Sequence, residues 1–79
     1  MAIVRSIDWI AEGGRVHPTE VDCEVRVIAE EGQQYLQISS FGSDTRRREK
    51  KVSQTLQFGR DVALELAAHI ERAFGTPRA

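Results

Sequence analysis

The sequence has few of the residues that build covalently or metal-stabilised scaffolds. Its 79 residues include one cysteine, Cys23, and two histidines. One cysteine cannot form an internal disulfide, and so few thiols and imidazoles exclude a classical zinc module. No apolar run approaches the ~18 residues of a membrane span, and the first residues lack the basic start and long apolar stretch of a signal peptide. We therefore expect a cytoplasmic protein that uses no metal or other cofactor.

The chain is also too short for more than one domain. Hydrophobic residues make up 41% of it and charged residues 29%, so residues 1–79 should fold as a single small domain. At this length one hydrophobic core is thin, and association of identical chains often supplies the missing buried area. The length therefore favours a homodimer.

Charge is almost balanced in total but is unevenly distributed. The net charge is −1, whereas residues 44–60 carry six basic and two acidic side chains, and residues 1–43 carry three basic and seven acidic ones. The balanced total argues against a general nucleic-acid coat protein, whose whole surface would be basic. A focused basic patch is compatible with this pattern.

Alternation of apolar and polar residues predicts four strands, at about 3–10, 19–30, 34–41 and 52–58. Glu31 and Gly32 stand at hairpin spacing between the second and third strands. One side of the sheet should be apolar, and Cys23 should behave there as a small, inert hydrophobe. We expect this side to hold Val21, Cys23, Val25, Val27, Leu36, Ile38 and Leu56.

A helix is predicted over residues 60–74, where apolar side chains recur at helical spacing. Asp61 in its first turn and Arg72 in its last suit the helix dipole, and Gly75 is typical of a helix end. The predicted fold class is α+β: a four-stranded, mostly antiparallel sheet followed by one C-terminal helix packed on one face, with a short tail at 75–79. The apolar surface of the helix is wider than one sheet contact requires. We therefore expect a dimer interface at Leu66, Ile70 and Phe74.

No catalytic motif stands out. His17 and a group of serines with Asp44 could suggest a nucleophile and its base, but the sequence contexts that mark an oriented base and an oxyanion site are absent. Residues of these types in loops and turns have simpler structural roles. We therefore expect a protein that is not an enzyme.

The basic run TRRREKK at 45–51 is the main candidate for a binding site. Phosphates require positive charge, and unstacked bases require flat side chains, which the neighbouring strand supplies as Tyr35 and Phe41. This combination predicts a non-enzymatic module for nucleic acid, in particular single-stranded DNA. The candidate phosphate contacts are Arg46, Arg47, Arg48, Lys50 and Lys51.

A second interpretation stays open, because charge runs in loops are also commonly solvated. The acidic strand and the basic loop would then be complementary surfaces of a protein-interaction or regulatory subunit that binds no nucleic acid. Exposure of Tyr35 and Phe41 near the basic run favours nucleic acid, whereas their burial in an interface favours the second interpretation.

The strand, loop, strand and helix sequences YLQISSFG, KVSQTLQF and GRDVALELAAHIERAF, in this order, resemble the positive cofactor four (p15) type of transcriptional coactivator over about residues 21–74. The resemblance implies a dimer that binds single-stranded DNA on a curved sheet through loop arginines and lysines and sheet aromatics. The stretches HPTEVDCE, SFGSDTR and KVSQ also resemble short bacterial proteins labelled methionyl-tRNA formyltransferase. A chain of this length cannot supply both a formyl-folate pocket and a tRNA cradle, so that label implies no activity here.

Overall fold

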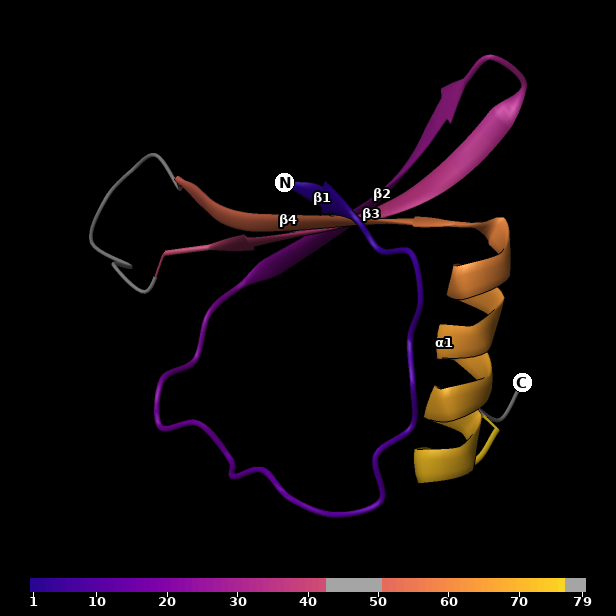
Figure 1. The fold of residues 1–79 in the computed structure, drawn as a ribbon. Helices are drawn as coiled ribbons and strands as arrows, with labels where there is room; N and C mark the ends of the chain where they lie inside the picture. Colours follow the sequence, from indigo (N-terminus) through magenta and orange to yellow (C-terminus); the bar gives the residue numbers. More distant parts are fainter. Residues whose placement is uncertain (43–50, 77–79) are drawn as a thin grey trace.

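A computed structural model describes residues 1–42 and 51–76, which form one sheet followed by one helix (Figure 1). The elements are β1 (Ala2–Ile3), β2 (Cys23–Glu30), β3 (Gln33–Phe41), β4 (Val52–Gly59) and α1 (Arg60–Phe74). The sheet order is β1-β4-β3-β2; β3 is antiparallel to both neighbours, and β1 is parallel to β4. The predicted α+β class, with a mostly antiparallel sheet and a closing helix, is confirmed. No helix within the described ranges combines the length and apolarity that a membrane crossing requires.

The predicted hairpin at Glu31 and Gly32 is confirmed. Glu30 pairs with Gln33, so only these two residues form the turn. Both have positive φ, 51° for Glu31 and 78° for Gly32, as in the type I′ turn whose twist matches the flanking strands. Glycine adopts this conformation freely, whereas glutamate is strained in it.

Replacing Glu31 by Asn should therefore stabilise the fold, because asparagine tolerates positive φ better than glutamate does. We expect the free energy of unfolding to rise by roughly 0.5–1 kcal/mol. Urea unfolding at one fixed protein concentration measures it, with Glu30→Asn, which lies within β2, as the control that gains nothing. An E31N protein no more stable than the parent would contradict the turn geometry.

The two faces of the sheet differ sharply in chemistry. Val25, Ile38 and Leu56 stand opposite one another on β2, β3 and β4, and Val27, Leu36 and Phe58 form the adjacent row. We call this the apolar face, made up of Cys23, Val25, Val27, Leu36, Ile38, Leu56 and Phe58. The opposite, polar face carries Glu24, Arg26, Tyr35, Gln37, Ser39, Phe41, Thr55 and Gln57. The predicted apolar side is thus confirmed for its strand residues, whereas Val21 precedes β2.

The predicted first strand over residues 3–10 is wrong, because β1 ends at Ile3. Ala2 pairs with Leu56 and Ile3 with Gln57, and one further bond joins the Val4 amide to the Gln57 carbonyl at 2.8 Å. Because β1 runs parallel to β4, its continuation would need more of β4, which ends at Gly59 and becomes helix. The alternating residues after Val4 therefore have no strand to pair with.

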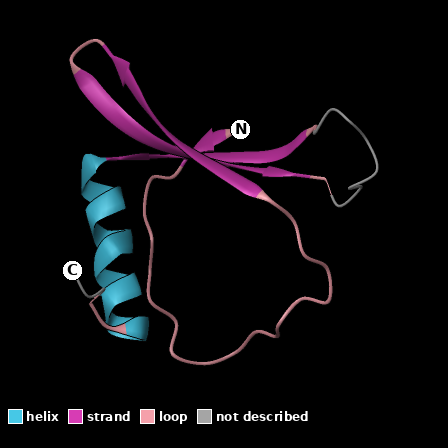
Figure 2. Ribbon diagram, turned by 180° about the vertical axis from the view of Figure 1, so that it is seen from behind, coloured by secondary structure: helices cyan, strands magenta, loops and turns pink. Residues whose placement is uncertain are grey.

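The predicted helix bounds are confirmed, but α1 does not lie across its own sheet. It leaves the end of β4 and extends away from the strands (Figures 1 and 2). None of its residues is buried: Leu66 is half-buried, Ile70 is 48% exposed and Phe74 87% exposed. β4 passes directly into α1 at Gly59 and Arg60, so no connecting loop allows the helix to fold back over the face.

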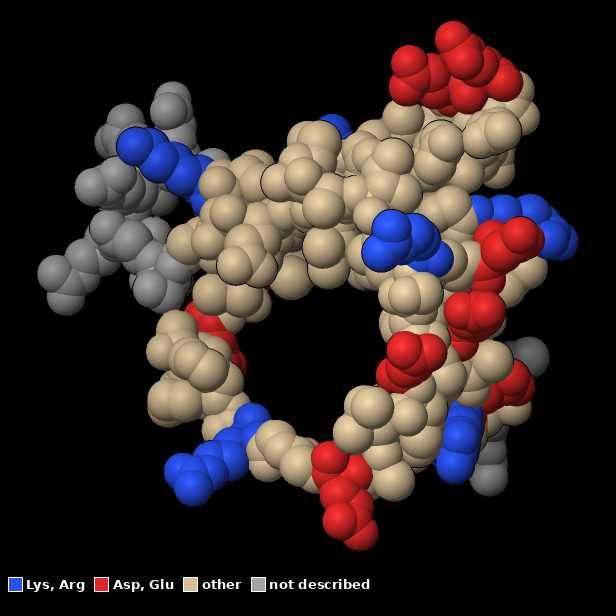
Figure 3. Space-filling view, viewed as in Figure 1, with Lys and Arg blue, Asp and Glu red and all other residues tan. Residues whose placement is uncertain are grey.

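Residues 4–22 connect the sheet edge to the far part of α1 and return to β2, which closes a ring (Figure 2). Trp9 holds this segment to the helix: its ring centroid lies 5.6 Å from that of His69, and the guanidinium carbon of Arg72 lies 4.1 Å from the Trp9 ring centroid. The space-filling view shows that side chains do not fill the middle of the ring (Figure 3).

The buried core of the described residues is small. Phe41 and Phe58 are its buried hydrophobic side chains, at 7% and 5% exposure. On the apolar face, Val25 and Val27 are each 62% exposed, and Cys23 is exposed. The expectation that Cys23 is a buried hydrophobe is therefore wrong within one chain, because α1 does not cover the face on which this residue lies.

Candidate functional site

Residues 45–51, which we call the basic segment, lie between β3 and β4 in the sequence, and the described residues on its two sides meet at one end of the sheet. The Gly42 amide donates to the Lys51 carbonyl at 3.1 Å, which holds the end of β3 beside the start of β4. Lys51 is exposed. The other candidate phosphate contacts, Arg46, Arg47, Arg48 and Lys50, lie outside the described residues.

A shallow pocket of about 480 Å³ opens on the polar face at this same end of the sheet. Phe41 and Val52, which flank the basic segment in the sequence, form part of its wall. The pocket places an aromatic ring, an amide, a guanidinium and a carboxylate next to one another. Its lining residues are Met1, Glu24, Arg26, Gln37, Ser39, Phe41, Val52 and Thr55.

Side-chain hydrogen bonds link β3 and β4 across the polar face. Gln57 Nε2 donates to Gln37 Oε1 at 2.8 Å, and Gln37 Nε2 donates to Ser39 Oγ at 3.4 Å. Ser39 and Thr55, each 7% exposed, share a hydroxyl hydrogen bond of 3.1 Å. The buried hydroxyls are thus satisfied by each other, while the two half-buried amides keep donor capacity that a ligand can use.

The charges near the pocket are largely compensated. Arg26 and Glu24 form an exposed ion pair at 3.3 Å, so Glu24 does not stand as an isolated negative charge beside the pocket. Glu30 and Glu31 lie at the β2–β3 turn, at the opposite end of the sheet from Lys51, where acidic side chains gather in Figure 3. Most of the acidic charge of the hairpin is therefore remote from the basic segment.

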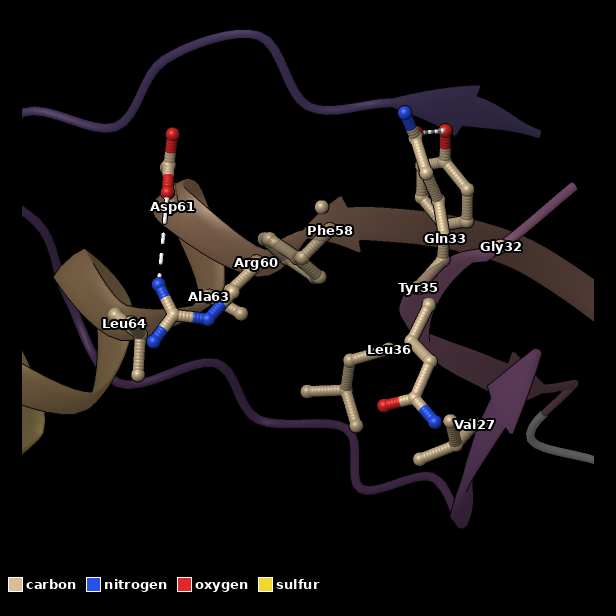
Figure 4. Close-up of a pocket in the computed structure, with 12 residues that line it drawn as sticks. Val27, Gly32, Gln33, Tyr35, Leu36, Phe58, Arg60, Asp61, Ala63 and Leu64 are labelled. Carbon is tan, nitrogen blue, oxygen red and sulfur yellow. Dashed lines mark hydrogen bonds and ion pairs between the residues drawn. The ribbon is translucent and has the colours of Figure 1, made fainter. Parts of the chain in front are cut away.

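The two candidate stacking aromatics lie at opposite ends of β3. They are separated by about 20 Å along the strand, at roughly 3.3 Å per residue. Phe41 is buried beside the basic segment. Tyr35 is half-buried near the turn, where its hydroxyl donates to Gln33 Oε1 at 2.9 Å, and it lines a different pocket (Figure 4). Only Phe41 therefore adjoins the basic segment.

Of the residues weighed for catalysis, His17 and Ser39 make structural hydrogen bonds, whereas Ser43 and Asp44 lie outside the described residues. His17 Nδ1 accepts a hydrogen bond from the Thr19 amide at 3.0 Å, and the Ser39 hydroxyl pairs with Thr55. Within residues 1–42 and 51–76, no group of three or more His, Cys, Asp or Glu side chains is placed to hold a metal ion.

Sequence interpretation did not name Gln37, Gln57 or Arg26, whose donor groups lie on the polar face in or beside this pocket. The available signal was that Gln37 occupies the same alternating row as Tyr35 and Phe41, and that Gln57 stands two residues after Thr55 on the next strand. The cross-strand register, which brings the two amides together, was not available from the sequence.

Comparison with protein-family models, curated proteins and solved structures finds no match for this chain. The resemblances to the positive cofactor four type and to the short formyltransferase-labelled proteins therefore stay predictions.

The hydroxyl pair gives a test of the polar face. Replacing Thr55 by Val keeps the side-chain shape but removes the closer of the two hydrogen-bond partners of the buried Ser39 hydroxyl, leaving only the Gln37 amide. We expect the free energy of unfolding to fall by about 1–2 kcal/mol. Chemical unfolding measures this, and Ser53→Ala, at an exposed position of the same strand, should change little. A T55V protein as stable as the parent would show that the pair contributes nothing.

Proposed function

We propose that the protein is a non-enzymatic, cytoplasmic module that binds single-stranded nucleic acid and acts as a homodimer. The observation that carries the proposal is the position of the polar-face pocket, at the sheet end where Gly42 and Lys51 meet. Positive side chains of residues 45–51 would contact phosphates. Lys51 is exposed, so its ammonium group is accessible for such a contact. Bases would lie over the polar face.

Base contacts on this face would be mainly hydrogen bonds. The amides of Gln37 and Gln57 and the guanidinium of Arg26 carry donors that suit base edges. Phe41, at 7% exposure, offers little open ring surface for stacking. The structure therefore supports a binding mode with fewer stacked bases than the sequence suggests.

A protein-interaction or regulatory subunit without nucleic-acid binding is the second candidate. The exposed apolar face favours it, because exposed apolar surface contacts protein more readily than nucleic acid.

The two candidates differ in how binding depends on salt. On single strands, each phosphate contact releases about 0.7 counterion, so replacing Arg46, Arg47 and Arg48 together by Ala should flatten the log–log salt slope by about 2. Exposed loop charges contribute little to stability, so the fold should be unchanged. Fluorescence anisotropy with labelled single-stranded DNA, duplex DNA and RNA at several salt concentrations measures the slope.

Arg15→Ala, at an exposed position in residues 4–22, serves as the control and should leave the slope unchanged. Equal binding and equal slope for the triple-alanine protein and the parent would remove the nucleic-acid proposal. No binding by the parent would favour the protein-interaction candidate.

A further inference from the structure

β2 forms a long edge of the sheet that has no neighbouring strand. It is the last strand in the order β1-β4-β3-β2 and, among the described strands, it pairs with β3 alone. Its eight residues contain no proline and no lysine, and they pair with β3 without a bulge. Proline, lysine and bulges are features that protect a sheet edge from further pairing. An edge without them is suited to accept another strand.

The backbone groups on this edge belong to alternate residues of β2. The Phe41 amide donates to the Asp22 carbonyl at 3.0 Å, so these two residues form a hydrogen-bonded pair where β2 and β3 begin to pair. Hydrogen-bonded pairs alternate with non-hydrogen-bonded pairs along an antiparallel ladder. Even-numbered residues of β2 therefore bond to β3. The backbone N–H and C=O groups of Cys23, Val25 and Val27 point toward the free edge.

The charges of β2 match those of a second copy of the same strand. Glu24 and Arg26 lie on either side of Val25 and form an exposed ion pair at 3.3 Å within the chain. When two β2 strands run antiparallel with Val25 opposite Val25, Glu24 of each copy lies opposite Arg26 of the other. Opposite charges directly across a strand pair stabilise it, and like charges destabilise it. This register also pairs the outward backbone groups of the two strands.

Other registers fit the charges or the chain less well. Those centred on Glu24 or on Arg26 place two like charges opposite each other. One centred on Ile28 joins Arg26 to Glu30, but it lays the β2–β3 turn of each copy beside the strand of the other. The charges and the turn together favour the register centred on Val25.

We propose that two copies pair through their β2 edges, antiparallel and with Val25 opposite Val25, to form one continuous sheet. The contact is twofold symmetric, so it closes with two chains. This inference deepens the homodimer part of the proposed function and rests on that part alone. It assigns the contact to the sheet edge, whereas the sequence predicts it on the helix.

The pairing joins the two polar-face pockets. Glu24 and Arg26 line the pocket of about 480 Å³ in each copy, and both lie beside the twofold axis of the paired strands. Because side chains alternate along a strand, the two polar faces lie on the same side of the joined sheet. The Glu24 carboxylate then lies between two guanidinium groups, one from each copy. A ligand on the polar face would thus contact both chains.

Charge reversal tests the pairing without nucleic acid. The parent should be dimeric in sedimentation equilibrium at about 100 μM. Glu24→Arg and Arg26→Glu should each raise the dimer dissociation constant roughly tenfold or more, because each turns two attractive contacts into repulsive ones. Glu30→Arg, at an exposed acidic position of the same strand, is the matched control and should not weaken the dimer. All three positions are exposed, so the fold should be unchanged, which circular dichroism checks.

Mixing the two weakened proteins tests whether positions 24 and 26 face each other. In a dimer of one E24R chain and one R26E chain, both cross-strand contacts again join opposite charges. The mixture should therefore dimerise at concentrations where each variant alone is monomeric. A mixture that stays monomeric would contradict the proposed register.

A cysteine at position 25 tests the register directly. Val25→Cys and Val27→Cys are compared, each with Cys23→Ser, because both valines are 62% exposed. In the proposed register the two copies of residue 25 have Cα atoms about 5.5 Å apart, within the disulfide range. The two copies of residue 27 are about 13 Å apart along the strands. Mild oxidation should thus link V25C into a covalent dimer much faster than V27C, and equal rates would overturn the pairing.

The remaining outcomes separate this inference from the proposed function. A parent that stays monomeric would overturn both the edge pairing and the homodimer. A dimeric parent that E24R and R26E leave unchanged would overturn the edge pairing alone, because the contact would then lie elsewhere. Weakening by E30R in place of E24R would overturn the register. Absence of nucleic-acid binding would remove that part of the proposed function and leave the edge pairing supported.

Discussion

The alternation of side chains along β3 determines which residues meet across the whole sheet. β3 pairs with β2 on one side and with β4 on the other, so Ile38 lies between Val25 and Leu56, and Ser39 lies between Glu24 and Thr55. A shift of one residue in either pairing would place polar groups among the aliphatic ones. The separation into an apolar and a polar face depends on this register.

The two faces of the sheet are stabilised in different ways. The polar face satisfies its buried hydroxyls through side-chain bonds between β3 and β4, so it is complete within one chain. The apolar face gains stability only when it is removed from water. Within one chain α1 lies beside only the Phe58 end of that face, because β4 passes into it without a loop. The direct join at Gly59 therefore leaves Val25, Val27 and Leu56 largely exposed.

The fold features that the sequence predicts well are set by local chemistry. The helix over 60–74 follows from its own spacing of apolar residues, and the turn at Glu31 follows from the glycine beside it. Residues 3–10 alternate as a strand should, yet most of them are unpaired, because pairing depends on where β4 ends. The direction that α1 takes could not be predicted either, since helical periodicity identifies an apolar side without identifying what covers it.

The candidate site could likewise be predicted from the sequence only in part. Phe41 lies at the end of β3 beside Lys51 of the basic segment, as its position in the sequence indicates. Tyr35 shares β3 with Phe41 but lies near its other end, which strand spacing alone indicates. The amide pair of Gln37 and Gln57 depends on cross-strand register, and its place beside the pocket emerges only in three dimensions.

The attachment of Trp9 to α1 has a consequence for the order of folding. Trp9 lies near the start of the sequence and its contacts, His69 and Arg72, lie near the end, so closing this loop costs more entropy than forming the β2–β3 hairpin. Contacts between distant parts of a chain form late in folding for this reason. Because Trp9 is the only tryptophan in the sequence, tryptophan fluorescence reports the late step in which residues 4–22 contact α1. Far-ultraviolet circular dichroism reports formation of the hairpins and the helix. The protein thus contains an intrinsic probe that separates closure of the ring from formation of its strands.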